Sequence, residues 1–221
     1  MTDTHMSSTF LHDGDIDANG IRQHYLRYGG AAGSRAHRDA VVLVPGSTSL
    51  AASWAFVGER FGRHFDTYVL DVRGGGLPGS ATQADASAPP PDDLEAQAAD
   101  LVAFAAALGL AHWAVVGHSQ GATLAAHAAA LKPPGLNRLA LIDPPVSGGI
   151  HADLSRLSVP VLLVTAERDS LVSEDDVFEM EIEMPGLTEV RVADAGHMIP
   201  WDNEEGFYQA FGAFLGATLD P

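Results

Sequence analysis

The sequence of 221 residues has no cysteine and only one lysine, Lys132. Without thiols the chain has no disulfide scaffold, no thiolate metal site and no cysteine nucleophile. Long apolar runs are also missing, because no stretch approaches the roughly 18 uncharged apolar residues that a transmembrane helix needs. The opening residues MTDTHMSSTF contain neither the basic nor the apolar region of a secretory signal. We therefore expect a cytoplasmic protein with no membrane partner.

Basic residues are scarce, with 12 Lys and Arg against 29 Asp and Glu and a formal net charge of -17. Such a chain repels polyanions, so nucleic acid and anionic membrane surfaces are poor partners. Charged residues make up 19% of the chain and hydrophobic residues 46%, which excludes the disordered class. These values indicate a globular protein, and we expect its partner to be a small-molecule substrate. Composition does not indicate an oligomeric state.

The order of apolar segments predicts one α/β domain. Residues 1–14 show no periodicity and are predicted to be a flexible tail, followed by a single domain over 15–221. Asn19-Gly20 separates two alternating segments and predicts an antiparallel hairpin. Beyond it, short runs of Val, Leu and Ile alternate with Ala-rich helical segments, which is typical of a mostly parallel, doubly wound sheet. Strands are predicted over 41–45, 67–72, 113–117, 139–143, 161–165 and 189–192, and helices over 51–61, 94–108, 121–131, 173–184 and 204–215.

Two motifs imitate cofactor or metal sites. Gly74-x-Gly76-x-x-Gly79 matches the dinucleotide fingerprint, but the following residues run into three prolines, so no helix begins there to hold a pyrophosphate. The segment that starts at Asp15 imitates a calcium loop, but its twelfth position is Leu26 rather than glutamate. We expect neither a cofactor nor a metal.

A third motif has the context that its chemistry requires. A predicted strand runs into Gly117-His118-Ser119-Gln120-Gly121 and then into a helix of small residues. This strand, sharp turn and helix form the nucleophile elbow of G-x-S-x-G enzymes, in which the turn lifts the serine oxygen above the sheet. The alternative is a serine that only caps the helix.

A serine nucleophile needs a histidine base, which in turn needs a carboxylate to orient it. Among the ten histidines, His197 follows the last predicted strand and precedes the final helix, at the edge where functional residues of such sheets collect. His118 is expected to pack beneath the turn. Asp143 and Asp169 each end a strand between the serine and the histidine, and either carboxylate is able to reach His197.

An oxyanion hole needs two backbone N–H groups. One comes from the residue after the nucleophile, which is Gln120. The other is expected from the loop after the first parallel strand, Val44-Pro45-Gly46-Ser47-Thr48, where the Ser47 amide follows the glycine.

These motifs, together with Gly196-His197-Met198, resemble the α/β-hydrolase fold superfamily along most of the chain. Segments 44–49, 54–57, 65–74 and 143–148 are most similar to the cofactor-independent amidohydrolases of pyridine-ring catabolism, the group of N-formylmaleamate deformylase and (E)-2-(acetamidomethylene)succinate hydrolase. The resemblance implies that the aspartate of the Asp-Pro-Pro turn, Asp143, is the triad acid. It also implies a helical cap with carboxylate-binding arginines, yet only residues 144–158 join Asp143 to the next strand, and they contain a single arginine, Arg156.

The expected function is that of a lidless serine hydrolase, which cleaves a small-acyl amide or ester through an acyl-enzyme. Ser119, Asp143 and His197 form its triad, and the amides of Ser47 and Gln120 form its oxyanion hole. A general short-chain carboxylesterase is the nearest alternative. A non-catalytic ligand-binding protein of the same fold is a third, because a fold does not fix a function.

Overall fold

The strands form one sheet in the order β1-β2-β4-β3-β6-β7-β8-β9, with β5 paired to β2. A computed structural model describes residues 10–29, 39–46, 49–74, 83–84, 93–145, 149–217 and 219. The pairs β1–β2, β2–β4 and β2–β5 are antiparallel, and the remaining pairs are parallel. The strands are β1 (Phe10–Ala18), β2 (Ile21–Tyr28), β3 (Ala40–Val44), β4 (Asp66–Leu70), β5 (Gln83–Ala84), β6 (Trp113–His118), β7 (Leu136–Ile142), β8 (Val161–Ala166) and β9 (Thr188–Val192).

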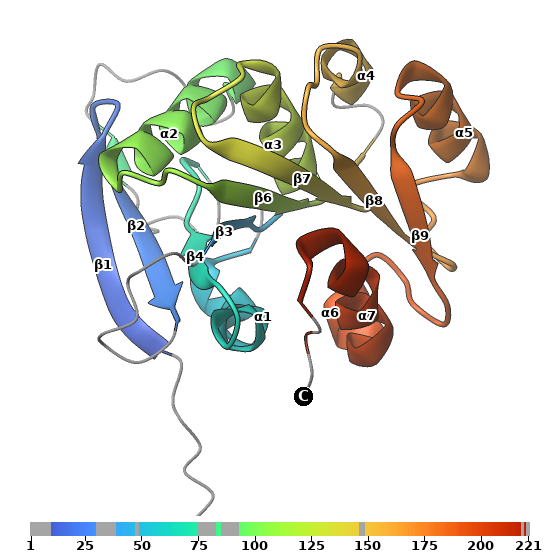
Figure 1. Cartoon of the computed structure of the whole chain (residues 1–221), viewed down its shortest axis with the longest axis horizontal. Coiled ribbons are helices and arrows are strands. Elements are labelled where there is room, and N and C mark those ends of the chain that lie inside the picture. Colours follow the sequence, from blue (N-terminus) through green and yellow to red (C-terminus); the bar gives the residue numbers. More distant parts are fainter. Residues whose placement is uncertain are drawn as a thin grey trace, which may run out of the picture.

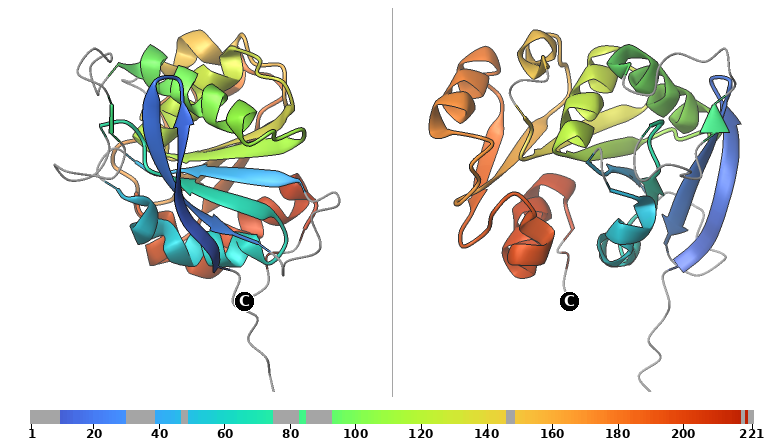
Figure 2. Two further views of the ribbon diagram at one scale, coloured as in Figure 1. Left: turned by 90° about the vertical axis from the view of Figure 1, so that its left-hand side faces the viewer. Right: turned by 180° about the vertical axis from the view of Figure 1, so that it is seen from behind.

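Helices cover both faces of this sheet (Figure 1). One face carries α2 (Leu94–Ala107), α3 (Gln120–Ala130), α4 (Ile150–Leu154) and α5 (Glu174–Glu183). The other carries α1 (Ala55–Gly62), α6 (Ile199–Asp202) and α7 (Glu204–Leu215), and a 3-10 helix, η1 (Ala51–Trp54), leads into α1. The view from behind in Figure 2 shows the same three layers.

Strand β3 is apolar at every position because it is buried on both faces of the sheet. Val41 and Leu43 belong to the core that also contains residues of α1 and α7. Ala40, Val42 and Val44 belong to the core on the opposite face, shared with α2 and α3. A strand buried on both faces has no polar side to alternate with, so it is a continuous hydrophobic run.

The strand order reverses direction between β3 and β6. From β3 the chain continues to β4 on one side, whereas β6 is followed by β7, β8 and β9 on the other. In open α/β sheets, such a switch point leaves a crevice at the carboxyl ends of the strands, where ligands bind. The residues that follow β3, β6, β7 and β8 therefore meet at one edge.

The structure confirms the predicted fold class and the hairpin, whose turn residues Asn19 and Gly20 both have positive φ, 51° and 74°. Strand β1 begins at Phe10, so residues 10–14 of the predicted tail are paired with β2, and residues 1–9 lie outside the described part of the chain. In the connection from β7 to β8, the described residues form one short helix, α4. Among the described residues, no helix is long and apolar enough to span a membrane.

Candidate active site

Ser119 lies in a strained turn between β6 and α3, with φ 53° and ψ -125°. The turn requires glycine on both sides. A β-carbon on Gly117 would lie 2.2 Å from the carbonyl oxygen of Gly121, and one on Gly121 would lie 2.2 Å from that of Val44. Strain of this kind persists only where the surroundings enforce it, and it is concentrated at functional sites. The Ser119 side chain makes no capping hydrogen bond to α3, so the helix-cap alternative is wrong.

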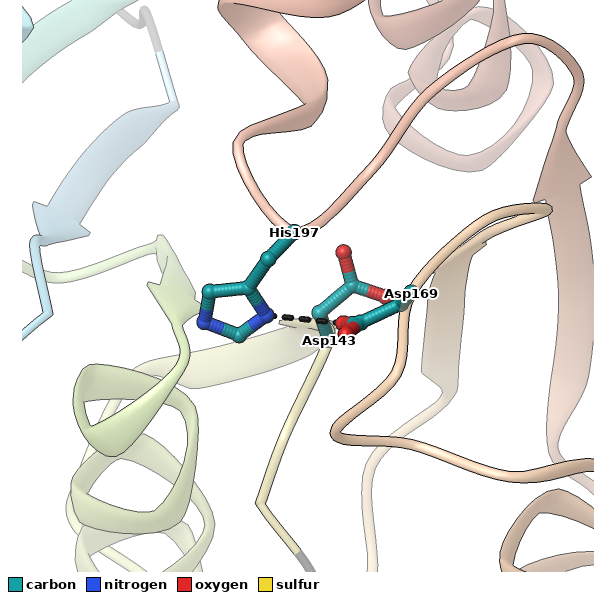
Figure 3. Close-up of side chains that lie close together, drawn as sticks. All are labelled: Asp143, Asp169 and His197. Atoms are coloured by element: carbon teal, nitrogen blue, oxygen red, sulfur yellow. Dashed lines mark hydrogen bonds and ion pairs between the residues drawn. The ribbon is translucent and has the colours of Figure 1, made fainter.

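Ser119 and His197 are in hydrogen-bond contact, with 3.0 Å between Oγ and Nε2. The other ring nitrogen of His197, Nδ1, lies 2.7 Å from Oδ2 of Asp169 (Figure 3). A hydroxyl, an imidazole and a carboxylate therefore form one hydrogen-bonded series. These separations lie within the range that a nucleophile and its base require.

Asp169 is held firmly for this contact. It follows β8 in a turn, and its side chain is 1% exposed. While Oδ2 faces His197, Oδ1 accepts a hydrogen bond of 2.7 Å from the backbone N–H of Leu171. Both oxygens are thus engaged, which fixes the orientation of the carboxylate.

Asp143 lies beside this pair but does not bind Nδ1 of His197. The three side chains are close, because one ring nitrogen or carboxyl oxygen of each lies within 4.8 Å of the others. Figure 3 shows both carboxyl groups on the same side of the imidazole. Oδ1 of Asp143 accepts a hydrogen bond of 2.9 Å from the N–H of Ala166. The structure therefore corrects the expectation that Asp143 orients His197, because its carboxyl points at the end of β8 and Asp169 occupies the position on the ring.

The environment of Asp143 favours its neutral form. The residue is fully buried and its Oδ2 has no hydrogen-bond partner among the described residues. Burial raises the pKa of Asp143 to about 8; the Ala166 hydrogen bond opposes this rise, and the charge of Asp169 adds to it. Two adjacent carboxyls rarely ionise together, so below this pKa Asp143 keeps its proton beside Asp169.

This difference predicts a pH-dependent stability. The pKa of Asp143 is higher in the folded state, about 8, than in an unfolded chain, about 3.9. The folded state then binds more protons between these values, so the contribution of Asp143 to stability falls as pH rises from about 4 to about 8. Asp143→Asn should remove that fall, since an amide keeps the Ala166 contact without ionising.

Denaturant unfolding from pH 4 to 9 measures the effect. The stability of Asp143→Asn relative to the unmodified chain should rise with pH. Asp17→Asn, at an exposed carboxyl of β1, is the matched control and should leave the pH profile unchanged. A relative stability of Asp143→Asn that is independent of pH would contradict the neutral state of Asp143.

Imidazole and carboxylate groups are also metal ligands, and Asp143, Asp169 and His197 place one ligand atom each within 4.8 Å of the others. Both ring nitrogens of His197 are already engaged, by Ser119 and by Asp169. Binding a cation would break one of these contacts. The arrangement fits proton transfer better than metal binding.

The predicted oxyanion donors are only partly described. Gln120 begins α3, where backbone N–H groups have no partner within the helix. Ser47 lies outside the described residues. Its neighbour Gly46 passes close to the nucleophile, since a β-carbon on Gly46 would lie 3.4 Å from the β-carbon of Ser119.

The Asp71-Val72-Arg73 segment, which follows β4, makes two buried contacts. Oδ1 of Asp71 accepts a hydrogen bond of 2.6 Å from the N–H of Ala51, which fixes η1 just after the Gly46 loop. Arg73 forms a buried two-point ion pair with Asp100, at 2.7 Å for each contact. Both contacts hold segments of the chain in place, and neither involves the Ser119 hydroxyl.

His118 has a contact that the sequence did not indicate. Its Nε2 lies 2.8 Å from the carbonyl oxygen of His197. Its ring packs against those of Trp54 and His197, with centroid separations of 5.4 Å and 4.9 Å. The prediction that His118 packs beneath the turn is compatible with this position, but the contact with the base was missed.

Comparisons with known proteins identify the family of this chain. The sequence profile of the α/β hydrolase fold matches residues 39–157. N-formylmaleamate deformylase of Pseudomonas putida is 39% identical over 278 aligned positions, which cover 96% of this chain and 99% of that protein. Because this chain has only 221 residues, the deformylase contains segments with no counterpart here.

Solved structures give the same result. The N-formylmaleamic acid deformylase of Pseudomonas putida S16 superposes with a TM-score of 0.76 at 30% identity, covering 90% of this chain and 99% of that one. A predicted CIB-like hydrolase of Thermoplasma acidophilum superposes with a TM-score of 0.80 at 19% identity, covering 93% of this chain and 98% of that one, which supports the fold alone. Homology supports a hydrolase, and the chain belongs to the α/β hydrolase fold family.

Proposed function

We propose that this protein is a serine hydrolase that cleaves the amide or ester of a small acyl group through an acyl-enzyme. The observation that carries the proposal is the hydrogen-bonded series from Ser119 through His197 to Asp169. The 39% identity to N-formylmaleamate deformylase favours a formyl or similarly small acyl group.

The reaction follows from the roles of these atoms. As Oγ of Ser119 attacks the substrate carbonyl carbon, its proton moves to Nε2 of His197. Asp169 holds the Nδ1 proton, so Nε2 is the free base, and the carboxylate stabilises the imidazolium that forms. The N–H groups of Gln120 and Ser47 bind the oxyanion.

The second half of the reaction reverses the proton movements. Collapse of the tetrahedral intermediate expels the amine or alcohol, which takes the proton from His197. Water then attacks the acyl-enzyme while His197 accepts a proton, and the acid is released as Ser119 recovers its hydrogen.

The short β7–β8 connection sets the substrate range. Its only arginine, Arg156, is paired with Asp153 at 3.2 Å and so is not placed to clamp a substrate carboxylate. Among the described residues this connection forms only the short helix α4, so we propose that the site excludes less water there and accepts bulky leaving groups. We therefore propose neutral or singly charged substrates rather than the dicarboxylates implied by the pyridine-ring amidohydrolases.

A substrate panel tests this function. Formyl, acetyl and butyryl groups are each presented as an amide and as an ester of the same leaving group, with a dicarboxylate formamide as comparison. We expect the highest kcat/KM for the small acyl groups and no preference for the dicarboxylate. Absence of turnover across the panel would overturn the proposal, and a strict preference for esters would favour a carboxylesterase.

The rate should depend on pH through the base. A protonated imidazole cannot accept the serine proton, so kcat/KM should fall as the solution is acidified. His118 should not contribute to the pH dependence above pH 5, because burial lowers the pKa of His118 to about 4. Steady-state kinetics between pH 5 and 8 should show a loss of rate on the acid side. A profile that is flat down to pH 5 would count against His197 as the base.

A further inference from the structure

His118 joins two segments that the reaction needs. It is 2% exposed and belongs to the elbow, next to the nucleophile. Its ring packs against the ring of His197 and against Trp54 of η1, with centroid separations of 4.9 Å and 5.4 Å. A single buried side chain thus touches both the loop of the base and the segment that follows the Gly46 loop.

The direction of its hydrogen bond is fixed by chemistry. The carbonyl oxygen of His197 only accepts, so Nε2 of His118 carries the proton and donates it across 2.8 Å. Burial keeps His118 neutral, since it lowers the pKa to about 4. Nδ1 is then an unprotonated acceptor. It has no partner among the described residues and lies 3.5 Å from the position of a β-carbon on Gly46.

The backbone beside His197 is held by side chains and turns rather than by a strand or helix. The N–H of Gly196 donates to Oδ2 of Asp202 at 2.8 Å, and the carbonyl of Ala195 accepts from the N–H of Arg168 at 2.9 Å. The His118 bond fixes the carbonyl of the base itself. Loss of this bond would let the loop move and change the distance from Nε2 of His197 to Ser119.

We infer that His118 is a positioning residue, which holds His197 in reach of Ser119 by donating a hydrogen bond to the His197 carbonyl. This inference rests on the proposed function. Its consequence is specific: the bond should affect the chemical step and leave substrate binding unchanged, because His118 is buried behind the base and has no open face toward substrate.

Three substitutions separate the hydrogen bond from the packing. His118→Phe keeps an aromatic ring against Trp54 and His197 but has no donor. His118→Gln loses the ring, yet its amide reaches the position of Nε2 and is able to donate. His118→Asn is the matched control for Gln, because it has the same amide on a side chain one methylene shorter.

The expected result is a loss confined to kcat. His118→Phe and His118→Asn should lower kcat on the order of 100-fold at unchanged KM, since displacing a catalytic group by about 1 Å has such an effect. His118→Gln should recover most of the rate. Thermal unfolding of each variant identifies any that fails to fold, and the Gln and Asn pair decides the matter if Phe does not.

Other outcomes overturn the inference. Equal rates for the Gln and Asn variants would show that the donor is irrelevant, and a rise in KM alone would place His118 in binding. Labelling of the unmodified protein by a fluorophosphonate distinguishes failure of the proposed function from failure of the role of His118. A protein that is not labelled refutes the proposed function, whereas a labelled protein with fully active Phe and Asn variants refutes only the role of His118.

Discussion

Ser119→Ala should lower kcat on the order of a million-fold, because members of a triad act as a unit and the nucleophile is lost. The fold should survive, since alanine removes one hydroxyl and the elbow is enforced by Gly117 and Gly121. The measurement is kcat on a substrate that the unmodified protein cleaves, together with thermal unfolding of both proteins.

Ser155→Ala is the matched control, because Ser155 is exposed at the end of α4. It should keep the full rate. If Ser119→Ala retains more than about a tenth of the activity, the loss is too small for a triad nucleophile and the assignment of Ser119 is wrong.

Asp169→Asn should lower kcat about ten-thousand-fold with the geometry intact. The amide donates to Nδ1 of His197 where the carboxylate accepts, so Nε2 would carry the ring proton and could not take one from Ser119. Steady-state kinetics of the purified variant, with circular dichroism as a check of the fold, measure this loss.

Asp143→Asn is the companion variant and should change kcat less than about tenfold, because an amide mimics the neutral carboxyl that we assign to Asp143. The two aspartates are neighbours, so the double variant should be measured with both singles. If Asp143→Asn is the crippling change and Asp169→Asn remains active, the acid is the aspartate of the Asp-Pro-Pro turn, as the family resemblance implied.

The sequence could not predict which of the two aspartates binds His197. Asp143 and Asp169 end the neighbouring strands β7 and β8, so both carboxyls arrive at the same edge and within reach of His197. Which one binds the ring depends on side-chain rotamers and on the Ala166 and Leu171 amides, and neither has a spacing signal. The elbow was predictable because its constraint is local: two glycines must flank the serine.

The fold was predictable for a similar reason. Runs such as Val41–Val44 are apolar at every position because helices cover both faces of the sheet. The helices α4 and α6 were missed, since four or five residues contain too little of the 3.6-residue period to be recognised. The contact from His118 to the His197 carbonyl joins residues 79 positions apart and has no sequence pattern at all.

Covalent labelling tests the nucleophile most directly. The protein is treated with a fluorophosphonate, and its intact mass and peptides are determined by mass spectrometry. One label per chain is expected on Ser119, with none on Ser119→Ala and slow labelling of Asp169→Asn. A label on another residue, or an active protein that takes up no label, would contradict a serine hydrolase built on Ser119 and His197.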